Sequence, residues 1–357
     1  MTYLQKVFNN SHLQQIAVCQ VTAMRLVTFS SNDNRQDNSQ RAGALIQNDS
    51  AVVDLQRAFA ALYRESNPAL ANVLALIEAG DEAQAIARDI IQRAPAEAIV
   101  ARSDVHLHAP IQPPPQMRDC SCFELHLQQC YEAARRMRVR NEPDPEAAYR
   151  ALDTSVEDRV LDTFRKQPIY YKCNRFATIG TDDDVIWPSY CRALDFELEW
   201  GCYIGKKAKD ISAANARDYI IGYTIFNDMS ARDAQGLEMP GQLGPAKGKD
   251  FDTANVMGPC LVTLDEIGDP YDLEMIARVN GEEWGRGNTG SMYWNFEQVI
   301  EHISRSETLY PGEFLGSGTV GNGCGLERMR YLKPNDVIEL EIAKLGILRS
   351  RVTKPAK

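Results

Sequence analysis

Residues 194–200 constrain the fold of this chain more than any other segment, because LDFELEW alternates strictly between apolar and acidic side chains. In a β-strand the apolar residues face one side, and the three acids Asp195, Glu197 and Glu199 face the other. Like charges on one strand face repel one another, so something must compensate them. A hard divalent cation with oxygen ligands does this directly. A solvated outer strand face is the alternative that this segment alone leaves open.

The sequence around this segment is also typical of strands. Between residues 168 and 350, short apolar runs alternate with Gly, Pro and Asp turns, and one helical stretch interrupts them at 295–304. This pattern predicts a β-rich barrel or sandwich. Residues 123–139 and 144–166 have a charged, helical pattern, and 141–167 is a candidate lid or interface arm.

A smaller unit precedes the proline-rich segment 111–116, which we interpret as a stiff linker. The sequence pattern of residues 24–110 predicts a strand and a hairpin, followed by two helices over 68–94 with the break between them at Gly80. We therefore expect a small N-terminal α+β domain over 24–110 and a second, larger domain over 117–357. Residues 1–23 contain one Lys, no Arg and no acid, and we interpret them as a leader or tail outside the fold.

Composition excludes several classes of partner. The net charge of −10 argues against nucleic acid or an anionic membrane, because both attract basic surfaces. No apolar run reaches the roughly 18 residues that a membrane span needs. The nine cysteines are an odd number scattered over 357 residues, which favours reduced thiols and predicts a cytoplasmic location.

Two further segments carry groups suited to a metal and an anionic substrate. Residues 227–233 (NDMSARD) end an apolar strand in a polar turn, where Asp228 is a candidate metal ligand and Arg232 a candidate anion partner. The glycine-rich loop 244–253 carries two lysines, and one of them is suited to stabilising a substrate carboxylate or a developing enolate. An Asx turn with a surface ion pair and a solvated loop are the respective alternatives.

The segment 118–130 offers a different set of groups. His126 is a natural general base near neutral pH. Together with Cys120, Cys122 and Cys130 it is also compatible with a zinc site, although the spacing matches no usual structural zinc pattern. A helix-packed histidine with buried thiols is the other interpretation. Residues 316–325 contain five glycines, which indicates close backbone approach to another group.

Taken in order, these motifs resemble the fumarylacetoacetate hydrolase family. The matching segments are LDFELE, NDMSARDAQ, GPAKGKDFDT and GSGTVGNG, and the resemblance covers most of residues 117–350. It implies an α+β, β-rich architecture in which a mixed β-roll or barrel forms the catalytic domain and a small domain precedes it. It also implies bound Mg²⁺, Mn²⁺ or Ca²⁺ and a homodimer.

The resemblance further implies roles for individual residues. The implied metal ligands are Asp119, Glu197, Glu199 and Asp228. The implied catalytic groups are His126, Glu327, which orients that histidine, and Lys249, which contacts the reacting centre. The implied substrate contacts are Arg232, Gln235, Thr319 and Tyr171, with Tyr170 as the neighbouring alternative.

Two positions depart from the family pattern. Gln129 stands where many bacterial relatives have a glutamate, and Met239 stands where the eukaryotic hydrolases have a tyrosine. The resemblance implies a metal-dependent hydrolase that cleaves a C–C bond in a 1,3-diketo acid such as an acylpyruvate or a fumarylacetoacetate-like compound. The alternative is a lyase of the same family, namely a 2-oxo acid decarboxylase, a hydratase or a sugar-acid dehydratase. A metal-stabilised protein without turnover is a third interpretation.

Overall fold

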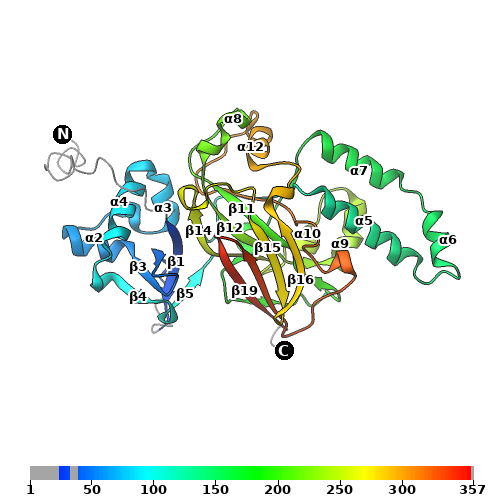
Figure 1. The fold of residues 1–357 in the computed structure, drawn as a ribbon, viewed down its shortest axis with the longest axis horizontal. Helices are drawn as coiled ribbons and strands as arrows, with labels where there is room; N and C mark the ends of the chain where they lie inside the picture. Colours follow the sequence, from blue (N-terminus) through cyan, green and yellow to red (C-terminus); the bar gives the residue numbers. More distant parts are fainter. Residues whose placement is uncertain (1–23, 33–38, 355–357) are drawn as a thin grey trace.

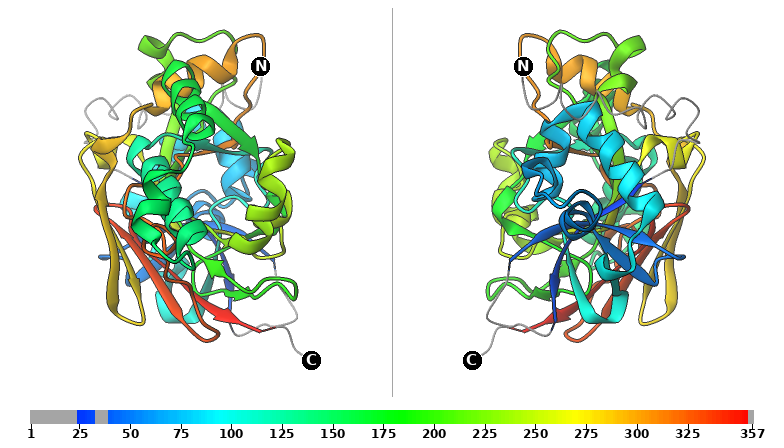
Figure 2. Two further views of the ribbon diagram at one scale, coloured as in Figure 1. Left: turned by 90° about the vertical axis from the view of Figure 1, so that its right-hand side faces the viewer. Right: turned by 90° about the vertical axis from the view of Figure 1, so that its left-hand side faces the viewer.

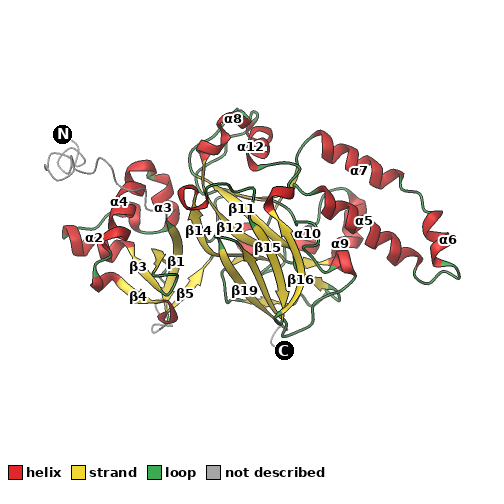
Figure 3. Ribbon diagram, in the orientation of Figure 1, coloured by secondary structure: helices red, strands yellow, loops and turns green. Residues whose placement is uncertain are grey.

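Strands form the centre of the molecule and helices lie around them (Figure 3). The computed structural model describes residues 24–32 and 39–354. The interpretation of residues 1–23 as a leader therefore lies outside the described residues. Within the described part of the chain, no helix combines the length and the apolar character needed to cross a bilayer.

The larger sheet runs through both halves of the chain. Its strands are β1 (Arg25–Ser31), β2 (Arg41–Ile46), β3 (Ala51–Asp54), β4 (Ile99–Ala101), β5 (Val105–His108), β6 (Met117–Ser121), β7 (Ile169–Lys172), β8 (Thr178–Ile179), β11 (Leu198–Ile204), β12 (Ile220–Asp228), β14 (Asn255–Thr263) and β17 (Phe314–Gly316). The main path is β4-β3-β2-β1-β14-β12-β11-β17-β6-β7, with β5 paired to β1 and β8 paired to β14. Because β4 and β7 each pair with one neighbour, the described sheet is open. The α+β, β-rich class is confirmed, and the closed barrel that the sequence also suggested is not formed.

A second sheet packs across the larger one. It contains β9 (Asp184–Ile186), β15 (Glu274–Val279), β16 (Glu282–Asn288), β18 (Val337–Ile342) and β19 (Gly346–Thr353), in the order β16-β15-β18-β19-β9. Its strands contact β11, β12 and β14. Alternate residues of β18 are buried, which is the pattern of a strand with one face on a core. The short strands β10 (Leu194–Asp195) and β13 (Ser230–Ala231) pair with each other.

Aromatic side chains fill the space between the two sheets. The ring of Trp200 on β11 lies 4.9 Å from the ring of Tyr223 and 4.9 Å from the ring of Phe296, measured between centroids. Phe296 begins α12 (Phe296–Ser304), the helix expected at 295–304. The other short helices near this core are α8 (Ala213–Ala216), α9 (Arg232–Glu238), α10 (Ala246–Lys249) and α11 (Leu264–Ile267).

The N-terminal part of the chain covers one end of the larger sheet with α2 (Leu55–Tyr63), α3 (Val73–Glu78) and α4 (Gly80–Arg93), drawn in blue and cyan in Figure 1. The last two are the helices expected over 68–94. Their buried residues share a core with Tyr203, Phe226 and Phe314 from β11, β12 and β17. Strand β1 also pairs with β14, so residues 24–110 extend the same sheet.

A group of helices projects from the opposite end, formed by α5 (Glu124–Val139), α6 (Pro145–Arg150) and α7 (Ser155–Lys166) (Figures 1 and 2). The single helical run expected at 144–166 is therefore two helices. Phe164 of α7 is fully buried, and its carbonyl accepts a hydrogen bond of 2.7 Å from Trp294 Nε1. An ion pair between Arg135 and Glu157 joins α5 to α7. These contacts hold α7 against the body of the molecule.

Candidate active site

Neighbouring strands bring the candidate residues to one cavity. The order β12-β11-β17-β6-β7 places Asp228, Glu199 and Asp119 on strands of one region of the sheet. Asp119 on β6 lies opposite Tyr171 on β7. The cavity has a volume of about 650 Å³. Its lining includes the candidates Asp119, His126, Tyr171, Glu197, Glu199, Gln235, Lys249 and Thr319.

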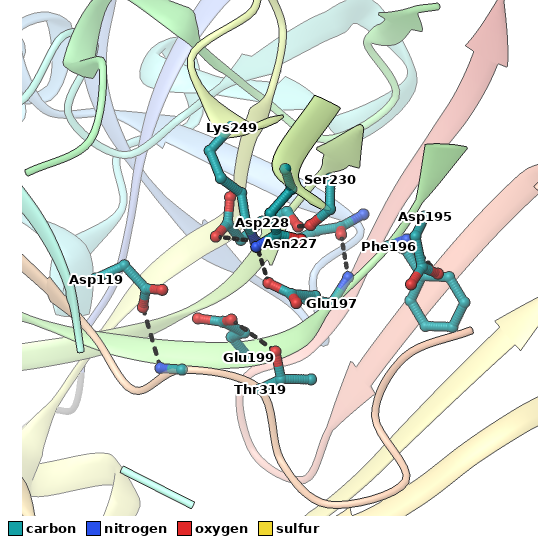
Figure 4. A network of polar contacts seen from close by, with 12 residues as sticks. Asp119, Asp195, Phe196, Glu197, Glu199, Asn227, Asp228, Ser230, Lys249 and Thr319 are labelled. Carbon is teal, nitrogen blue, oxygen red and sulfur yellow. Dashed lines mark hydrogen bonds and ion pairs between the residues drawn. The ribbon is translucent and has the colours of Figure 1, made fainter. Parts of the chain in front are cut away.

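Three buried carboxylates form the centre of this site (Figure 4). Asp119, Glu199 and Asp228 each offer an oxygen, and these oxygens all lie within 4.8 Å of one another. Glu199 Oε2 and Asp228 Oδ1 are buried without a hydrogen-bond partner. Buried polar atoms are normally satisfied, so the two unpaired oxygens indicate that a further group belongs between them. An all-oxygen, anionic set of this kind fits Mg²⁺, Mn²⁺ or Ca²⁺.

The electrostatics of these acids favour the binding of a cation. Burial, reinforced by the charge of Asp228, raises the pKa of Asp119 to about 7. Burial likewise raises the pKa of Asp228 to about 6, although Lys249 acts against it. The pKa of Glu199 is raised well above its ordinary value by burial and by the neighbouring carboxylates. A cation bound among these carboxylates favours their charged forms and lowers their pKa values.

Glu197 is placed differently from the other three acids. It forms ion pairs with Lys249 and with Arg232, whose Nη2 lies 2.8 Å from Glu197 Oε1. Burial raises the pKa of Glu197, but the charges of Lys249 and Arg232 outweigh burial and hold this pKa well below its ordinary value. The structure thus places Glu197 in the cavity wall beside the three-carboxylate group.

Asp195 does not join the other acids, and the prediction of one uninterrupted alternating strand is wrong here. Strand β10 ends at Asp195 and β11 begins at Leu198, so the alternation is broken between them. Asp195 instead accepts hydrogen bonds from Arg232 Nε at 2.9 Å and from the Gly325 amide at 2.8 Å. Figure 4 shows it apart from Asp119 and Glu199.

Lys249, on the short helix α10, is the cation nearest to the carboxylates. Its Nζ donates to Asp228 Oδ2 at 2.6 Å and also pairs with Glu197. Burial lowers the pKa of this ammonium, but Asp228 and Glu197 outweigh burial and raise the pKa above its ordinary value. Lys249 therefore stays charged, and it can donate a hydrogen bond to an anionic oxygen in the cavity.

His126 and Glu327 form a pair at the edge of the cavity. His126 lies on α5, and its Nδ1 is 2.8 Å from Oε1 of Glu327, which belongs to the turn η9 (Leu326–Arg328). Burial lowers the pKa of His126, but hydrogen bonds with Cys324 and Glu327 outweigh burial and raise the pKa to about 10. Glu327 holds Nδ1, and Nε2 is left to act on another group.

Two residues that were expected to contact the substrate instead donate hydrogen bonds to the carboxylates. Tyr171 donates its hydroxyl hydrogen to Asp228 Oδ2 at 2.6 Å, and Thr319 donates to Glu199 Oε1 at 3.2 Å. Both line the cavity, and Tyr170 and Gln235 also line it. Arg232 is absent from the described lining: it is buried behind Glu197, and its Nη1 donates to Gln235 Oε1 at 3.0 Å.

Glycines at the end of β17 and in the following loop allow the backbone to approach Asp119 and Cys120 closely. The Gly318 amide donates to Asp119 Oδ1 at 3.0 Å. Gly318 has φ of +71°, and a Cβ there would lie 2.2 Å from the Cys120 carbonyl oxygen. A Cβ on Gly316 would lie 2.5 Å from Asp119 Oδ1. The five clustered glycines were the only sequence signal for this close approach.

The structure does not assemble the cysteine set that the sequence offered for zinc. Cys120 and Cys122 are buried in the core. Among the described residues, the soft ligands grouped with His126 are Cys130 and Cys324 instead. Gln129, which replaces a glutamate of bacterial relatives, contacts the glycine-rich loop: its Nε2 donates to Asn322 Oδ1 at 2.8 Å, and its Oε1 accepts from the Asn322 amide at 2.9 Å.

The family model for the C-terminal part of fumarylacetoacetate (FAA) hydrolase matches residues 136–353, well over half of the chain. The matched range includes Glu197, Glu199, Asp228, Lys249 and Glu327, whereas Asp119 and His126 precede it.

Relatives extend this similarity over nearly the whole chain. The mitochondrial oxaloacetate tautomerase of Xenopus laevis is 31% identical over 355 residues, covering 97% of each chain. The 2,4-didehydro-3-deoxy-L-rhamnonate hydrolase of a Sphingomonas species is 36% identical over 57% of this chain and 72% of that protein. The structure of a maleylpyruvate hydrolase from a Sphingobium species, in complex with manganese(II) and pyruvate, superimposes with a TM-score of 0.67 at 20% identity, covering 93% of this chain and 100% of that one. With the matched family model and a relative that spans nearly all of its length, this chain belongs to the fumarylacetoacetate hydrolase family of enzymes.

Proposed function

We propose that this enzyme hydrolyses a C–C bond in a 1,3-diketo acid, such as an acylpyruvate or a fumarylacetoacetate-like compound. The observation that carries the proposal is the His126–Glu327 pair, joined at 2.8 Å, at the edge of a cavity that is also lined by Asp119, Glu197, Glu199 and Lys249. Hydrolysis needs a base that activates water and a cation that receives the charge of the leaving enolate, and the cavity offers both.

Asp119, Glu197, Glu199 and Asp228 are the residues that would hold Mg²⁺, Mn²⁺ or Ca²⁺. When bound, such an ion would neutralise the acids and polarise the oxygens of a chelating oxo acid. The unpaired oxygens of Glu199 and Asp228 support this assignment. The manganese(II) in the related maleylpyruvate hydrolase structure is consistent with it.

A cation held by the carboxylates would oppose the charged form of His126 and lower its pKa. In this proposal the neutral His126 ring takes a proton from water at Nε2, while Glu327 fixes the ring through Nδ1. The hydroxide oxygen bonds to the substrate carbonyl carbon, and the adjacent C–C bond breaks. The electron pair of that bond becomes an enolate, and the Lys249 ammonium donates a hydrogen bond to its oxygen. The proton held by His126 then returns to the enolate carbon, which yields two acids. Gln235 and Tyr170 line the cavity wall, and in this proposal they contact the acyl part.

Keto–enol tautomerisation of a 2-oxo diacid is a second candidate. The relative that spans 97% of this chain is named an oxaloacetate tautomerase. The same His126 and Lys249 would move a proton to and from carbon and stabilise the enolate, with no C–C bond broken. The two candidates therefore differ in whether water enters the product.

Ultraviolet loss of the enol absorption tests both candidates. We expect Mg²⁺- or Mn²⁺-dependent decay with a panel of acylpyruvates, abolished by a chelator, with two acids as products. Enol loss of oxaloacetate without new products would instead support the tautomerase. Release of CO₂ or water from 2-oxo diacids or sugar acids would support the lyase alternative, and no reaction with a bound ion would contradict both proposals.

Replacing the proposed base provides the matched test. His126→Ala should lower turnover by about 10²–10⁴-fold, because a positioned base contributes about that much. Metal binding should be unchanged, since His126 is not among the proposed ligands. Tyr310→Phe, at an exposed tyrosine, serves as a control that should retain activity. Activity of His126→Ala within a few-fold of the parent would refute the base assignment.

We also propose that the protein is a homodimer that acts on a small oxo acid in the cytoplasm, without nucleic acid or membrane partners. Leu237, Met239 and Leu243 are exposed large apolar side chains within seven residues of chain, and a group of such side chains is typical of a contact surface. Light scattering should give twice the chain mass of 40.0 kDa. A monomer would refute the dimer, and fractionation that places the protein in mitochondria would refute the location.

A further inference from the structure

A second group of potential metal ligands lies beside the carboxylate cluster. His126 and Cys130 are four residues apart on α5, so they share one face of the helix. Cys324 reaches them from the glycine-rich loop just before η9. The ligand atoms of these three residues all lie within 4.8 Å of one another.

The spacing of this group suits a tetrahedral ion. Cys130 Sγ lies 3.5 Å from His126 Nε2 and 3.7 Å from Nδ1, so the sulfur stands beside the imidazole ring. Bonds of about 2.3 Å to sulfur and about 2.0 Å to nitrogen at a tetrahedral angle place the two ligand atoms about 3.5 Å apart. The distance from Cys130 Sγ to Nε2 therefore matches that of two ligands of one tetrahedral ion, and in the bound form the Cys130 side chain turns its sulfur away from Nδ1 toward the Nε2 lone pair.

Glu327 orients two of the three ligands. Its Oε1 holds His126 Nδ1 at 2.8 Å, and its Oε2 accepts a hydrogen bond of 3.2 Å from the Cys324 amide. A carboxylate behind a histidine is the usual support for a metal-binding imidazole, because it fixes the ring and leaves Nε2 as the ligand. The Glu327 side chain is 1% exposed, so water does not compete for the hydrogen bonds that it makes.

The two ligand groups differ in chemical softness. Carboxylate oxygens suit hard ions such as Mg²⁺, whereas thiolate sulfur with imidazole suits Zn²⁺ and similar soft ions. An ion reaches the soft group without unfolding, because His126 lines the cavity and both His126 and Cys130 are partly exposed. The site differs from the sequence-based set, since Cys324 replaces Cys120 and Cys122.

We propose that His126, Cys130 and Cys324 form a binding site for a soft divalent ion of the zinc type, and that an ion bound there inhibits the enzyme. Both thiols and the protonated Nε2 of His126 release their protons to solvent on binding. The ion occupies His126 Nε2, so this nitrogen no longer takes a proton from water. The inhibition rests on the proposed role of His126 as the base, whereas the binding does not.

Cadmium titration tests the binding without any substrate. Reduced protein saturated with Mg²⁺ is titrated with Cd²⁺, and the ultraviolet thiolate-to-cadmium charge-transfer absorption is recorded. We expect one Cd²⁺ per chain with this absorption in the parent protein. Cys130→Ser and Cys324→Ser should each weaken binding at least about tenfold, as expected when a metal ligand is lost.

Cys260→Ser is the matched control. Cys260 is also buried, but its Sγ contacts the Leu345 carbonyl oxygen and it is not part of the soft-ligand group. This variant should bind Cd²⁺ as the parent does. Absence of the absorption in the parent, or an unchanged titration in Cys130→Ser and Cys324→Ser, would overturn the site.

Zinc inhibition tests the second half of the proposal. With an active oxo-acid substrate and Mg²⁺ present, Zn²⁺ should inhibit the parent and Cys260→Ser. Cys130→Ser should require at least about tenfold more Zn²⁺ for half inhibition, measured against its own Mg²⁺-dependent rate without Zn²⁺. Equal inhibition of Cys130→Ser would show that zinc acts at the carboxylates, and it would overturn the inhibitory role. If no substrate is turned over, the proposed function fails while the Cd²⁺ titration still decides the site.

Discussion

Glu199 shows how one residue can weaken the fold and serve the site. It is fully buried, one of its oxygens has no partner, and burial together with the neighbouring acids raises its pKa. Asp195, at the end of β10, is equally buried, but its charge is neutralised by Arg232. An acid retained without a counter-charge is typical of a ligand site, whereas a paired acid is typical of structural support.

The first prediction follows from this difference. Glu199→Gln should lower Mn²⁺ affinity by at least about tenfold, because changes even beyond the ligands cost about 10–100-fold. It should leave the metal-free protein as stable as the parent or more stable, because a repelled buried charge is removed. Isothermal titration and thermal melts without metal measure the two effects.

Asp195→Asn is the contrasting variant. It should destabilise the metal-free protein, because Arg232 loses a buried partner, while the metal stoichiometry stays at the parent value. Unchanged Mn²⁺ affinity in Glu199→Gln would remove Glu199 from the ligand set.

The second prediction concerns pH and stability at His106 on β5. A hydrogen bond with Asp183 raises the pKa of His106 above its ordinary value, and Asp183 Oδ1 lies 3.1 Å from Nε2. The stabilisation is therefore complete below the unfolded-state pKa of about 6.5 and is lost as pH rises through the higher folded-state pKa. His106→Gln should cost more stability at about pH 6 than at about pH 8.

Urea unfolding of the parent and His106→Gln at both pH values measures this difference. His302→Gln is a useful control, because burial lowers the pKa of His302 and its effect on stability has the opposite pH dependence. A pH-independent cost for His106→Gln would show that the ion pair does not form in solution.

At the scale of elements, strand ends and helix starts set the geometry of the core and the site. Helix α12 begins with a capping box, in which the Asn295 side chain accepts from the Gln298 amide and the Gln298 side chain accepts from the Asn295 amide. This start fixes Phe296 against Trp200 on β11, the strand that carries Glu199. Local sequence chemistry thus contributes directly to the position of a site strand.

The third prediction tests this helix start. Asn295→Ala should cost about 1 kcal/mol of stability, within the usual range of about 0.5–2 kcal/mol for a lost cap. Asn215→Ala, at an exposed position inside α8, should change stability by less than about 0.5 kcal/mol. Equal effects of the two substitutions in urea unfolding would contradict the capping role.

At the scale of the whole molecule, the two halves of the chain are joined by more than a linker. Leu26 on β1 is fully buried and lies opposite Leu261 on β14. The helices α2–α4 share a core with residues of β11, β12 and β17. We therefore expect residues 24–110 and the catalytic part to unfold together.

The fourth prediction uses the natural probes of the chain. All four tryptophans, at 187, 200, 284 and 294, lie in the catalytic part. Leu26→Ala should cost about 2–5 kcal/mol, as for other buried leucines. The unfolding midpoints from tryptophan fluorescence and from circular dichroism should shift together. A fluorescence midpoint that stays at the parent value would show that the two parts unfold independently.

The sequence by itself determined the family, the strand-rich class, the helix at 295–304 and the residues whose chemistry suits a metal and an oxo acid. These features depend on local patterns: alternation, turn residues and the order of short motifs. It did not predict that Asp195 lies apart from Glu197 and Glu199. The strand breaks between Asp195 and Leu198, but apolar and acidic residues still alternate across the break, so the sequence pattern does not show it.

Only the tertiary structure decided which groups meet. Asp119, Glu199 and Asp228 come from three strands, and Glu327 reaches His126 across 201 residues of chain. Cys324 joins His126 and Cys130 only because the glycine-rich loop folds back past α5. Such contacts depend on strand order and loop path, which non-local packing selects, and no spacing within one segment encodes them.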